Sequence, residues 1–187
     1  MTDDATLEKL RYPLGPMPIV ASPVSDGQRE AWIGQIERLP LRLRNVVSAF
    51  TLVQWDTRYR PGGWTVRQLV HHLADSHMNA YTRFKLALTE DEPTIKPYDE
   101  AAWAELADTF ETPPDVSLAL LDAVHTRWVV LLRSVADSDW SRSIYHPEYE
   151  RTLSLDQLLA QYAWHCEHHL RHITALVERE VWTKASR

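Results

Sequence analysis

Hydrophobic residues recur three or four positions apart in four long segments of the 187-residue chain, which is the spacing of one face of an α-helix. The first segment runs over about 28–50, and the second begins near Thr65 after a turn signal. The third follows the helix-start sequence TPPD, and the fourth spans roughly 154–180. The longer connection between the second and third segments, with a short helix expected over 98–106, predicts an all-α four-helix bundle with a crossover connection between helices 2 and 3.

Prolines interrupt this pattern in two places. Four prolines lie within 1–25 and predict an extended N-terminal arm, which leaves 26–187 as a single four-helix-bundle domain. Pro40 lies inside the first helical segment, where we expect it either to kink the helix or to start a second piece. The segment 137–152 shows no helical pattern and is predicted to be polar and irregular.

Composition and charge narrow the class of protein. Hydrophobic residues make up 44% of the chain and charged residues 25%, the balance of a globular domain. No apolar run is long enough for a membrane span, and the N-terminus has no basic region followed by an apolar one, so we expect a cytoplasmic protein. The net charge of −6 and the lack of a basic block predict no nucleic-acid binding. Cys166, the single cysteine, lies at the centre of the last apolar stripe and is expected to be buried and inert.

Histidines are concentrated on the second and fourth helical segments. His165 and His169 are four residues apart at one edge of the last apolar stripe, so both can reach a single ion. His72 falls at the edge of the apolar stripe of the second helix. Three histidines from two packed helices predict a metal site with open positions, as in catalytic zinc sites. The metalloprotease motif HExxH is absent, because Glu167 stands two residues after His165.

The other residues near these positions have simpler interpretations. We expect His77 to be packed and hydrogen-bonded in the core, and we expect three further histidines to be solvated or to lie behind the ligands: His71, His168 and His172. A polar strip continues along the second helix through Ser76, Asn79 and Arg83. A solvated face explains this strip as well as a substrate-binding pocket wall does. In the second case Arg83 would hold an anionic group of a small-molecule substrate.

Several segments resemble the YfiT-like branch of the DinB/YfiT superfamily. They are GGWTVRQLVHHLADSHMN at 62–79, RFKLALTE at 83–90, KPYD at 96–99, YHP at 145–147, the histidine-rich stretch 164–173, and RYPLG at 11–15. The resemblance covers nearly the whole chain. It implies a four-helix bundle whose metal ligands are His72, His165 and His169, with zinc or nickel as the ion, and a homodimer.

The resemblance also implies an enzyme, since members of the superfamily are metal-dependent hydrolases or thiol S-transferases that use thiols such as bacillithiol. We predict a thiol S-transferase acting on electrophilic small molecules, without assigning a catalytic residue. Hydrolysis by an activated water is the alternative, weakened because no carboxylate stands at an obvious general-base position beside the ligands. A non-catalytic metal-binding bundle is the third possibility, and there His146 would complete a closed coordination sphere.

Overall fold

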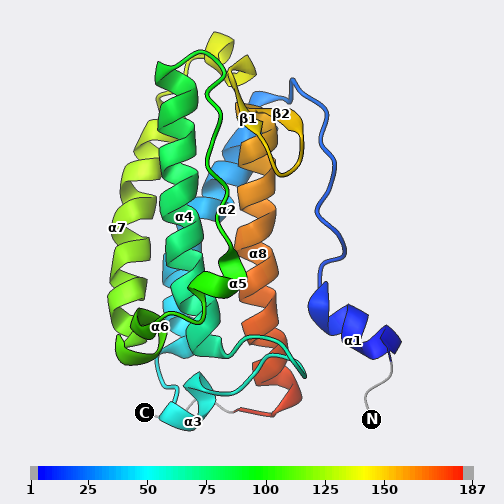
Figure 1. The fold of residues 1–187 in the computed structure, drawn as a ribbon, viewed down its shortest axis with the longest axis vertical. Helices are drawn as coiled ribbons and strands as arrows, with labels where there is room; N and C mark the ends of the chain where they lie inside the picture. Colours follow the sequence, from blue (N-terminus) through cyan, green and yellow to red (C-terminus); the bar gives the residue numbers. More distant parts are fainter. Residues whose placement is uncertain (1–3, 183–187) are drawn as a thin grey trace.

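A bundle of four long helices forms the body of the protein, as the computed structural model of residues 4–182 shows (Figure 1). These helices are α2 (Asp26–Val47), α4 (Val66–Thr89), α7 (Pro114–Arg133) and α8 (Leu155–Arg179). Helix α2 packs against α7 and α8, and α4 packs against the same two helices from the other side. Helices α4 and α7 run in the same direction because the chain between them returns along the length of the bundle. The predicted four-helix bundle and its crossover are therefore confirmed.

Shorter helices and two strands lie in the segments that connect or precede the four long helices. They are α1 (Asp4–Arg11), α3 (Leu52–Trp55), α5 (Glu100–Trp103), α6 (Ala107–Glu111), the 3-10 helix η1 (Asp137–Ser141), and the strands β1 (Ser143–His146) and β2 (Arg151–Ser154). The strands form an antiparallel hairpin. The crossover pairs with it, since Tyr145 N–H donates to the Pro93 carbonyl at 3.0 Å and Ile95 N–H donates to the Tyr145 carbonyl at 3.1 Å.

Local sequence signals set the beginnings of the two histidine-bearing helices. Thr65 caps α4 and Ser154 caps α8, and in each case the glutamine three residues later completes a capping box. Helix α7 begins at Pro114, the position where a proline has no intrahelical hydrogen bond to lose. These starts fix the registers of α4 and α8, and with them the faces on which the histidines lie.

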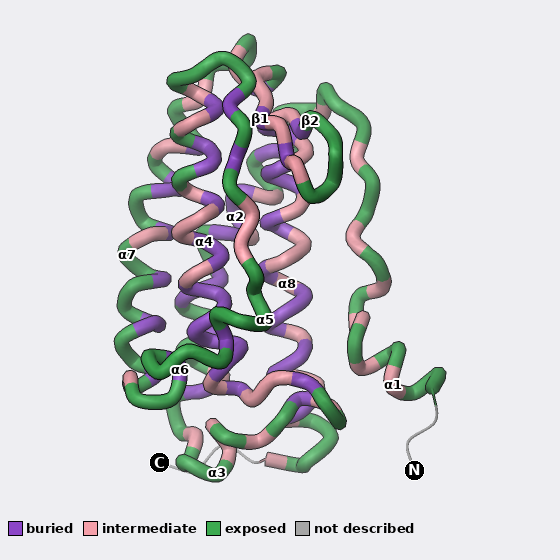
Figure 2. Tube along the Cα trace, in the orientation of Figure 1, coloured by how far each residue is buried: buried purple, intermediate pink, exposed green. Residues whose placement is uncertain are grey.

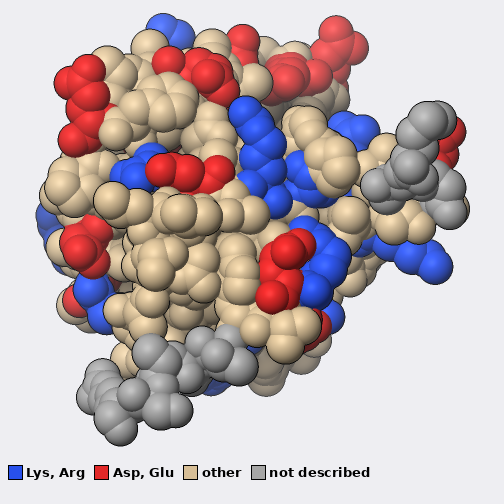
Figure 3. All heavy atoms as spheres, turned by 90° about the horizontal axis from the view of Figure 1, so that it is seen from below, with Lys and Arg blue, Asp and Glu red and all other residues tan. Residues whose placement is uncertain are grey.

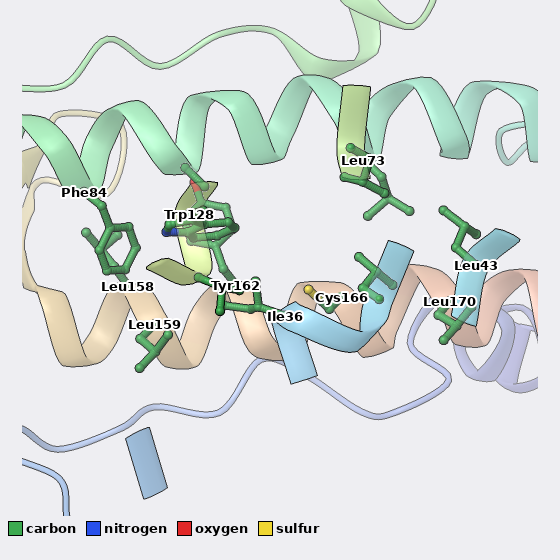
Figure 4. Packing of buried hydrophobic residues seen from close by; sticks show 14 of the residues in the cluster. Ile36, Leu43, Leu73, Phe84, Trp128, Leu158, Leu159, Tyr162, Cys166 and Leu170 are labelled. Carbon is green, nitrogen blue, oxygen red and sulfur yellow. The ribbon is translucent and has the colours of Figure 1, made fainter. Parts of the chain in front are cut away.

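The core runs along the bundle axis between the four helices. The buried positions of each long helix face inward, and the exposed positions face outward (Figure 2). Large side chains from all four helices meet there, including Ile36, Phe84, Trp128 and Leu158, each less than 2% exposed (Figure 4). Polar side chains in this interior, such as His77 and His125, need hydrogen-bond partners there, because burial removes them from water.

Two predictions about local structure are wrong, and for Pro40 one of the two alternatives is excluded. The N-terminal arm is not extended throughout, because residues Asp4–Arg11 form a helix with an acidic first turn and basic residues in the last turn. Helix α2 passes through Pro40 as one continuous helix, so Pro40 does not start a second piece. The segment predicted to be irregular contains η1 and the hairpin, whose strands of four residues each are too short to show a periodic pattern.

Basic and acidic side chains are interspersed with uncharged ones on the end of the bundle seen in Figure 3. Within residues 4–182, no helix combines the length and apolar character that crossing a bilayer requires.

Candidate metal centre

The three histidines singled out from the sequence converge inside the bundle. His72 comes from the second turn of α4, and His165 and His169 come from successive turns of α8. One ring nitrogen from each lies within 4.8 Å of the others, and all three rings are in mutual contact. The packing of α4 against α8 thus brings together side chains that are 93 residues apart in sequence.

The spacing of the two best-aligned nitrogens fits a metal ion. The Nε2 atoms of His72 and His165 face each other at 3.2 Å. A divalent ion about 2.0–2.1 Å from each imidazole nitrogen holds two such nitrogens about 2.9–3.4 Å apart at coordination angles near 90–110°. The donor set is three imidazoles and, among residues 4–182, the group contains no cysteine, carboxylate or fourth histidine. The residues present therefore fit a divalent cation with open coordination positions.

Burial keeps these imidazoles in the form that binds metals. Burial lowers the pKa of His72 to about 4, with the neighbouring His168 adding to the effect. Burial likewise lowers the pKa values of His165 and His169 well below the usual range, and the adjacent histidines lower them further. Neutral imidazole carries the lone pair that a metal ion accepts, so the site is ready for a cation at neutral pH.

The four remaining histidines of these two helices are all buried. His77 is 0% exposed and hydrogen-bonded, as predicted. The solvated interpretation of the other three is wrong, because each is 7% exposed or less. Ser117 covers His71 and the N-terminal arm covers His168 and His172, through contacts between segments that the helical pattern alone cannot show.

Two of the three candidate ligands have histidines behind them. His77 Nε2 lies 3.1 Å from Nδ1 of His165, and His172 Nδ1 lies 3.4 Å from Nδ1 of His169. The position of His172 agrees with the alternative prediction of a residue behind the ligands. His125 of α7, which lies 2.7 Å from His77, was missed. Its signal was present in the sequence, since it falls on the apolar stripe of its helix between Leu121 and Trp128.

A small cleft of about 50 Å³ leads from His165 toward the crossover and the hairpin. Ser76 and Arg83, two members of the polar strip on α4, line it. Arg83 is 8% exposed and donates a hydrogen bond to the Tyr162 hydroxyl at 2.8 Å. Asn79 does not line this cleft; its amide turns back and donates to the Asp75 carbonyl, one helical turn earlier.

The far wall of the cleft consists of residues that no helical pattern identifies. Glu100 of the crossover and Glu148 of the hairpin loop line it, so carboxylates do lie near the metal centre. Burial raises the pKa of Glu100, and the nearby Glu148 raises it further. His146 also lines the cleft, and its buried Nδ1 has no hydrogen-bond partner among residues 4–182, but His146 is not in the three-histidine group. These residues become neighbours only because the crossover pairs with the hairpin.

Cys166 follows His165 in α8 and projects roughly 60–100° around the helix axis from the two candidate ligands of that helix. It is 0% exposed, and burial raises the pKa of its thiol well above the usual range. The expected buried cysteine is confirmed, and a thiol in this environment is a poor nucleophile.

Comparisons with known proteins agree with this geometry. The family model described as the DinB superfamily matches residues 35–173, which include all four bundle helices in whole or in part. The chain belongs to the DinB superfamily. Within it, a solved structure of YfiT from Bacillus subtilis superimposes with a TM-score of 0.91 at 48% identity, covering 94% of this chain and 99% of that one. That structure is described as an unusual four-helix bundle.

Related DinB-superfamily sequences extend over almost the whole chain. YfiT of B. subtilis is 48% identical over 178 residues, which is 95% of this chain and 99% of YfiT. A relative from Oceanobacillus iheyensis is 53% identical over 151 residues, which is 81% of this chain and 87% of that protein. Both relatives are named as candidate metal-dependent hydrolases. The chain is thus a YfiT-like member of the superfamily.

Proposed function

We propose that this DinB-superfamily protein is a metal-dependent enzyme that uses His72, His165 and His169 to hold one divalent ion, zinc or nickel. The observation that carries the proposal is the approach of three neutral imidazoles at metal-binding distances, two of them buried and the third, His165, partly exposed to a cleft. A site closed for structure alone has four protein ligands. Here the group contains three, and His146 stands apart from it.

The reaction we propose is the transfer of a low-molecular-weight thiol, such as bacillithiol, to an electrophilic small molecule. A divalent ion in this site supplies Lewis-acid chemistry, which favours the thiolate form of a thiol at an open position. The thiol sulfur forms a bond to the electrophilic carbon, the leaving group departs with the electron pair of its bond, and the thiol proton passes to solvent. This reaction needs no carboxylate base in contact with the ligands.

The cleft supplies the contacts for the thiol substrate. Arg83 presents a buried positive charge next to the Tyr162 hydroxyl, which suits a carboxylate of the thiol. Ser76 adds a hydroxyl on the same helix, one turn from His72. The aromatic and apolar lining from Pro97, Tyr98 and Tyr149 covers the rest of the substrate and excludes water.

The test is an assay of thioether formation. Protein loaded with zinc or nickel is incubated with bacillithiol and a chlorinated electrophile, and the conjugate is measured by mass spectrometry. We expect conjugate well above the level seen with His72→Ala, which removes one ligand. Wild-type protein that makes no more conjugate than His72→Ala would exclude the transferase.

Hydrolysis is a second candidate, favoured by Glu100. Its raised pKa, due to burial and Glu148, brings a carboxyl group closer to the range of a general base or acid at neutral pH. Turnover of esters or amides without any thiol, lost in Glu100→Gln, would favour hydrolysis over transfer. The names of the relatives point the same way.

The assembly and the location of the protein are also proposals. We propose a homodimer, which light scattering of the purified protein tests directly, and a cytoplasmic location. Neither affects the metal chemistry, because all three ligands come from one chain.

A further inference from the structure

Two buried histidines, His77 and His125, connect the candidate ligand His165 to the backbone of α2. The distances along the chain of contacts are 3.1 Å from His165 Nδ1 to His77 Nε2, 2.7 Å from His77 Nδ1 to His125 Nε2, and 2.6 Å from His125 Nδ1 to the Ile36 carbonyl. His77 is 0% exposed and His125 is 2% exposed. The path crosses the bundle from α8 through α4 and α7 to α2.

Pro40 explains why the Ile36 carbonyl is available. In an α-helix the N–H of residue i donates to the carbonyl of residue i−4, and proline has no N–H. Pro40 lies inside α2, so the carbonyl of Ile36 has no intrahelical donor. His125 Nδ1 supplies the missing hydrogen bond. Without this partner the carbonyl would be buried and unsatisfied, which destabilises the folded state.

The direction of every hydrogen bond in this relay follows from its anchor. A carbonyl only accepts, so the proton of His125 is on Nδ1, and the Nε2 of a neutral His125 must accept from His77 Nδ1–H. His77 Nε2 therefore accepts from His165 Nδ1–H. The lone pair of a neutral His165 is then on Nε2, the atom that faces His72.

We propose that His77 and His125 are positioning residues that hold His165 in the tautomer with its proton on Nδ1 and its lone pair on Nε2, directed at the metal. The inference rests on the proposed metal site. Because the relay ends on a carbonyl, which cannot take up a proton, it orients the ligand and does not conduct protons out of the site. Histidines that bind metals are held in one tautomer by such partners, and loss of the partner weakens metal affinity 10–100-fold in order of magnitude.

A shorter relay of the same design lies behind His169. His172 Nε2 donates to the carbonyl of Arg11 at 3.0 Å, and its Nδ1 lies 3.4 Å from His169 Nδ1. Arg11 is the last residue of α1, so its carbonyl also lacks an intrahelical donor. The same reasoning puts the lone pair of His169 on Nε2. Two of the proposed ligands, His165 and His169, are thus oriented by buried histidines. Each of these relays ends at a backbone carbonyl that has no hydrogen-bond donor within its own helix.

The test measures the tautomer of His165 in metal-free protein and the affinity for zinc separately. Ring nitrogen chemical shifts of ¹⁵N-labelled histidines distinguish protonated from unprotonated Nδ1 and Nε2. Zinc affinity is measured by competition with a chelator. In the wild type we expect His165 with its proton on Nδ1. In His125→Phe, which removes the acceptor for His77, we expect a mixture of tautomers and a zinc Kd raised about 10–100-fold.

Controls separate the relay from general damage to the core. His71→Leu changes a buried histidine of α4 that bonds Ser117 instead of a ligand, and it should leave the His165 tautomer and the zinc Kd within about twofold of wild type. His77→Gln keeps both a donor and an acceptor and should recover part of the affinity lost in His77→Leu. The rescue remains informative if His125→Phe does not fold.

Two outcomes would overturn the relay: wild-type His165 protonated on Nε2 in metal-free protein, or a His125→Phe variant with unchanged tautomer and zinc Kd. Wild-type protein that shows the expected tautomer but binds neither zinc nor nickel would instead refute the proposed metal function and leave the relay standing.

Discussion

Arg29 on α2 and Asp156 at the start of α8 form a bidentate ion pair at the top of the bundle. Arg29 Nε donates to Asp156 Oδ1 at 2.7 Å, and its Nη2 donates to Oδ2 at 3.2 Å. Asp156 is 0% exposed, and it also accepts from the Ser22 hydroxyl and the Val24 N–H of the N-terminal arm. One buried carboxylate therefore ties together two bundle helices and the segment that leads to Arg11 and the metal centre.

We expect Asp156→Asn to lower the free energy of unfolding by about 3 kcal/mol, because it leaves the buried Arg29 charge with only the exposed Asp26 as counter-ion. Urea denaturation measures this change. Glu37→Gln is the matched control, since it breaks an exposed ion pair between α2 and Arg133 of α7 and should cost less than about 1 kcal/mol. Equal losses in the two variants would show that the buried ion pair contributes no more to the free energy of unfolding than the exposed one.

Metal binding should stabilise the folded protein. At a free zinc concentration about 100 times the Kd, a single site adds about 2.7 kcal/mol to the free energy of unfolding. We expect this gain, seen as a rise in Tm, to be lost in His169→Ala. His146→Ala should keep it, because His146 lies outside the three-histidine group. A Tm that zinc and nickel leave unchanged in the wild type would contradict the site.

Acid should destabilise the metal-free protein through its buried histidines. Burial lowers the pKa of His125 to about 4, although the hydrogen bond that it donates to the Ile36 carbonyl acts in the opposite direction. Between about pH 6.5 and pH 4 the unfolded chain binds a proton at this position and the folded chain does not. Stability is therefore complete above pH 6.5 and falls as the pH drops toward 4, by up to about 1.4 kcal/mol per unit for each such histidine.

Urea denaturation in the presence of a chelator, repeated from pH 7.5 to pH 4.5, measures this dependence. We expect His125→Gln to show a shallower fall than the wild type, because one titrating group is gone. Stability curves that stay parallel across the range would contradict a neutral, buried His125.

Arg83 should determine affinity for an anionic thiol. Removing the charge in Arg83→Met takes away a charge-assisted hydrogen bond worth about 1.5–3 kcal/mol, so we expect the Kd of bacillithiol for the zinc-loaded protein to rise about 10–100-fold. Titration calorimetry measures it. Asn79→Ala is the control on the same helix, since Asn79 does not line the cleft, and its Kd should stay within about twofold of wild type.

The sequence predicted those parts of the site that depend on one helix at a time. Helical spacing alone places His165 and His169 on one face of α8. The apolar stripes of α4 and α8 predict that the two helices pack together, and this packing brings His72 beside them. The relay partners and the far wall of the cleft depend on contacts between segments. His125 looks like an ordinary core position of α7, and Glu100 reaches the site only because the crossover pairs with the hairpin.

Replacing Pro40 with alanine should change stability and zinc affinity in opposite directions. Pro40→Ala restores an N–H that competes with His125 for the Ile36 carbonyl, and it removes a residue that costs a helix interior about 3 kcal/mol relative to alanine. We expect a free energy of unfolding equal to or above that of the wild type, together with a zinc Kd raised a few-fold as the anchor of the relay weakens. Urea denaturation of metal-free protein and chelator competition measure the two quantities independently. A variant that gains stability with no loss of zinc affinity would show that Pro40 has no part in orienting His165. His125 would then orient the relay equally well when the Ile36 carbonyl also accepts a hydrogen bond from residue 40.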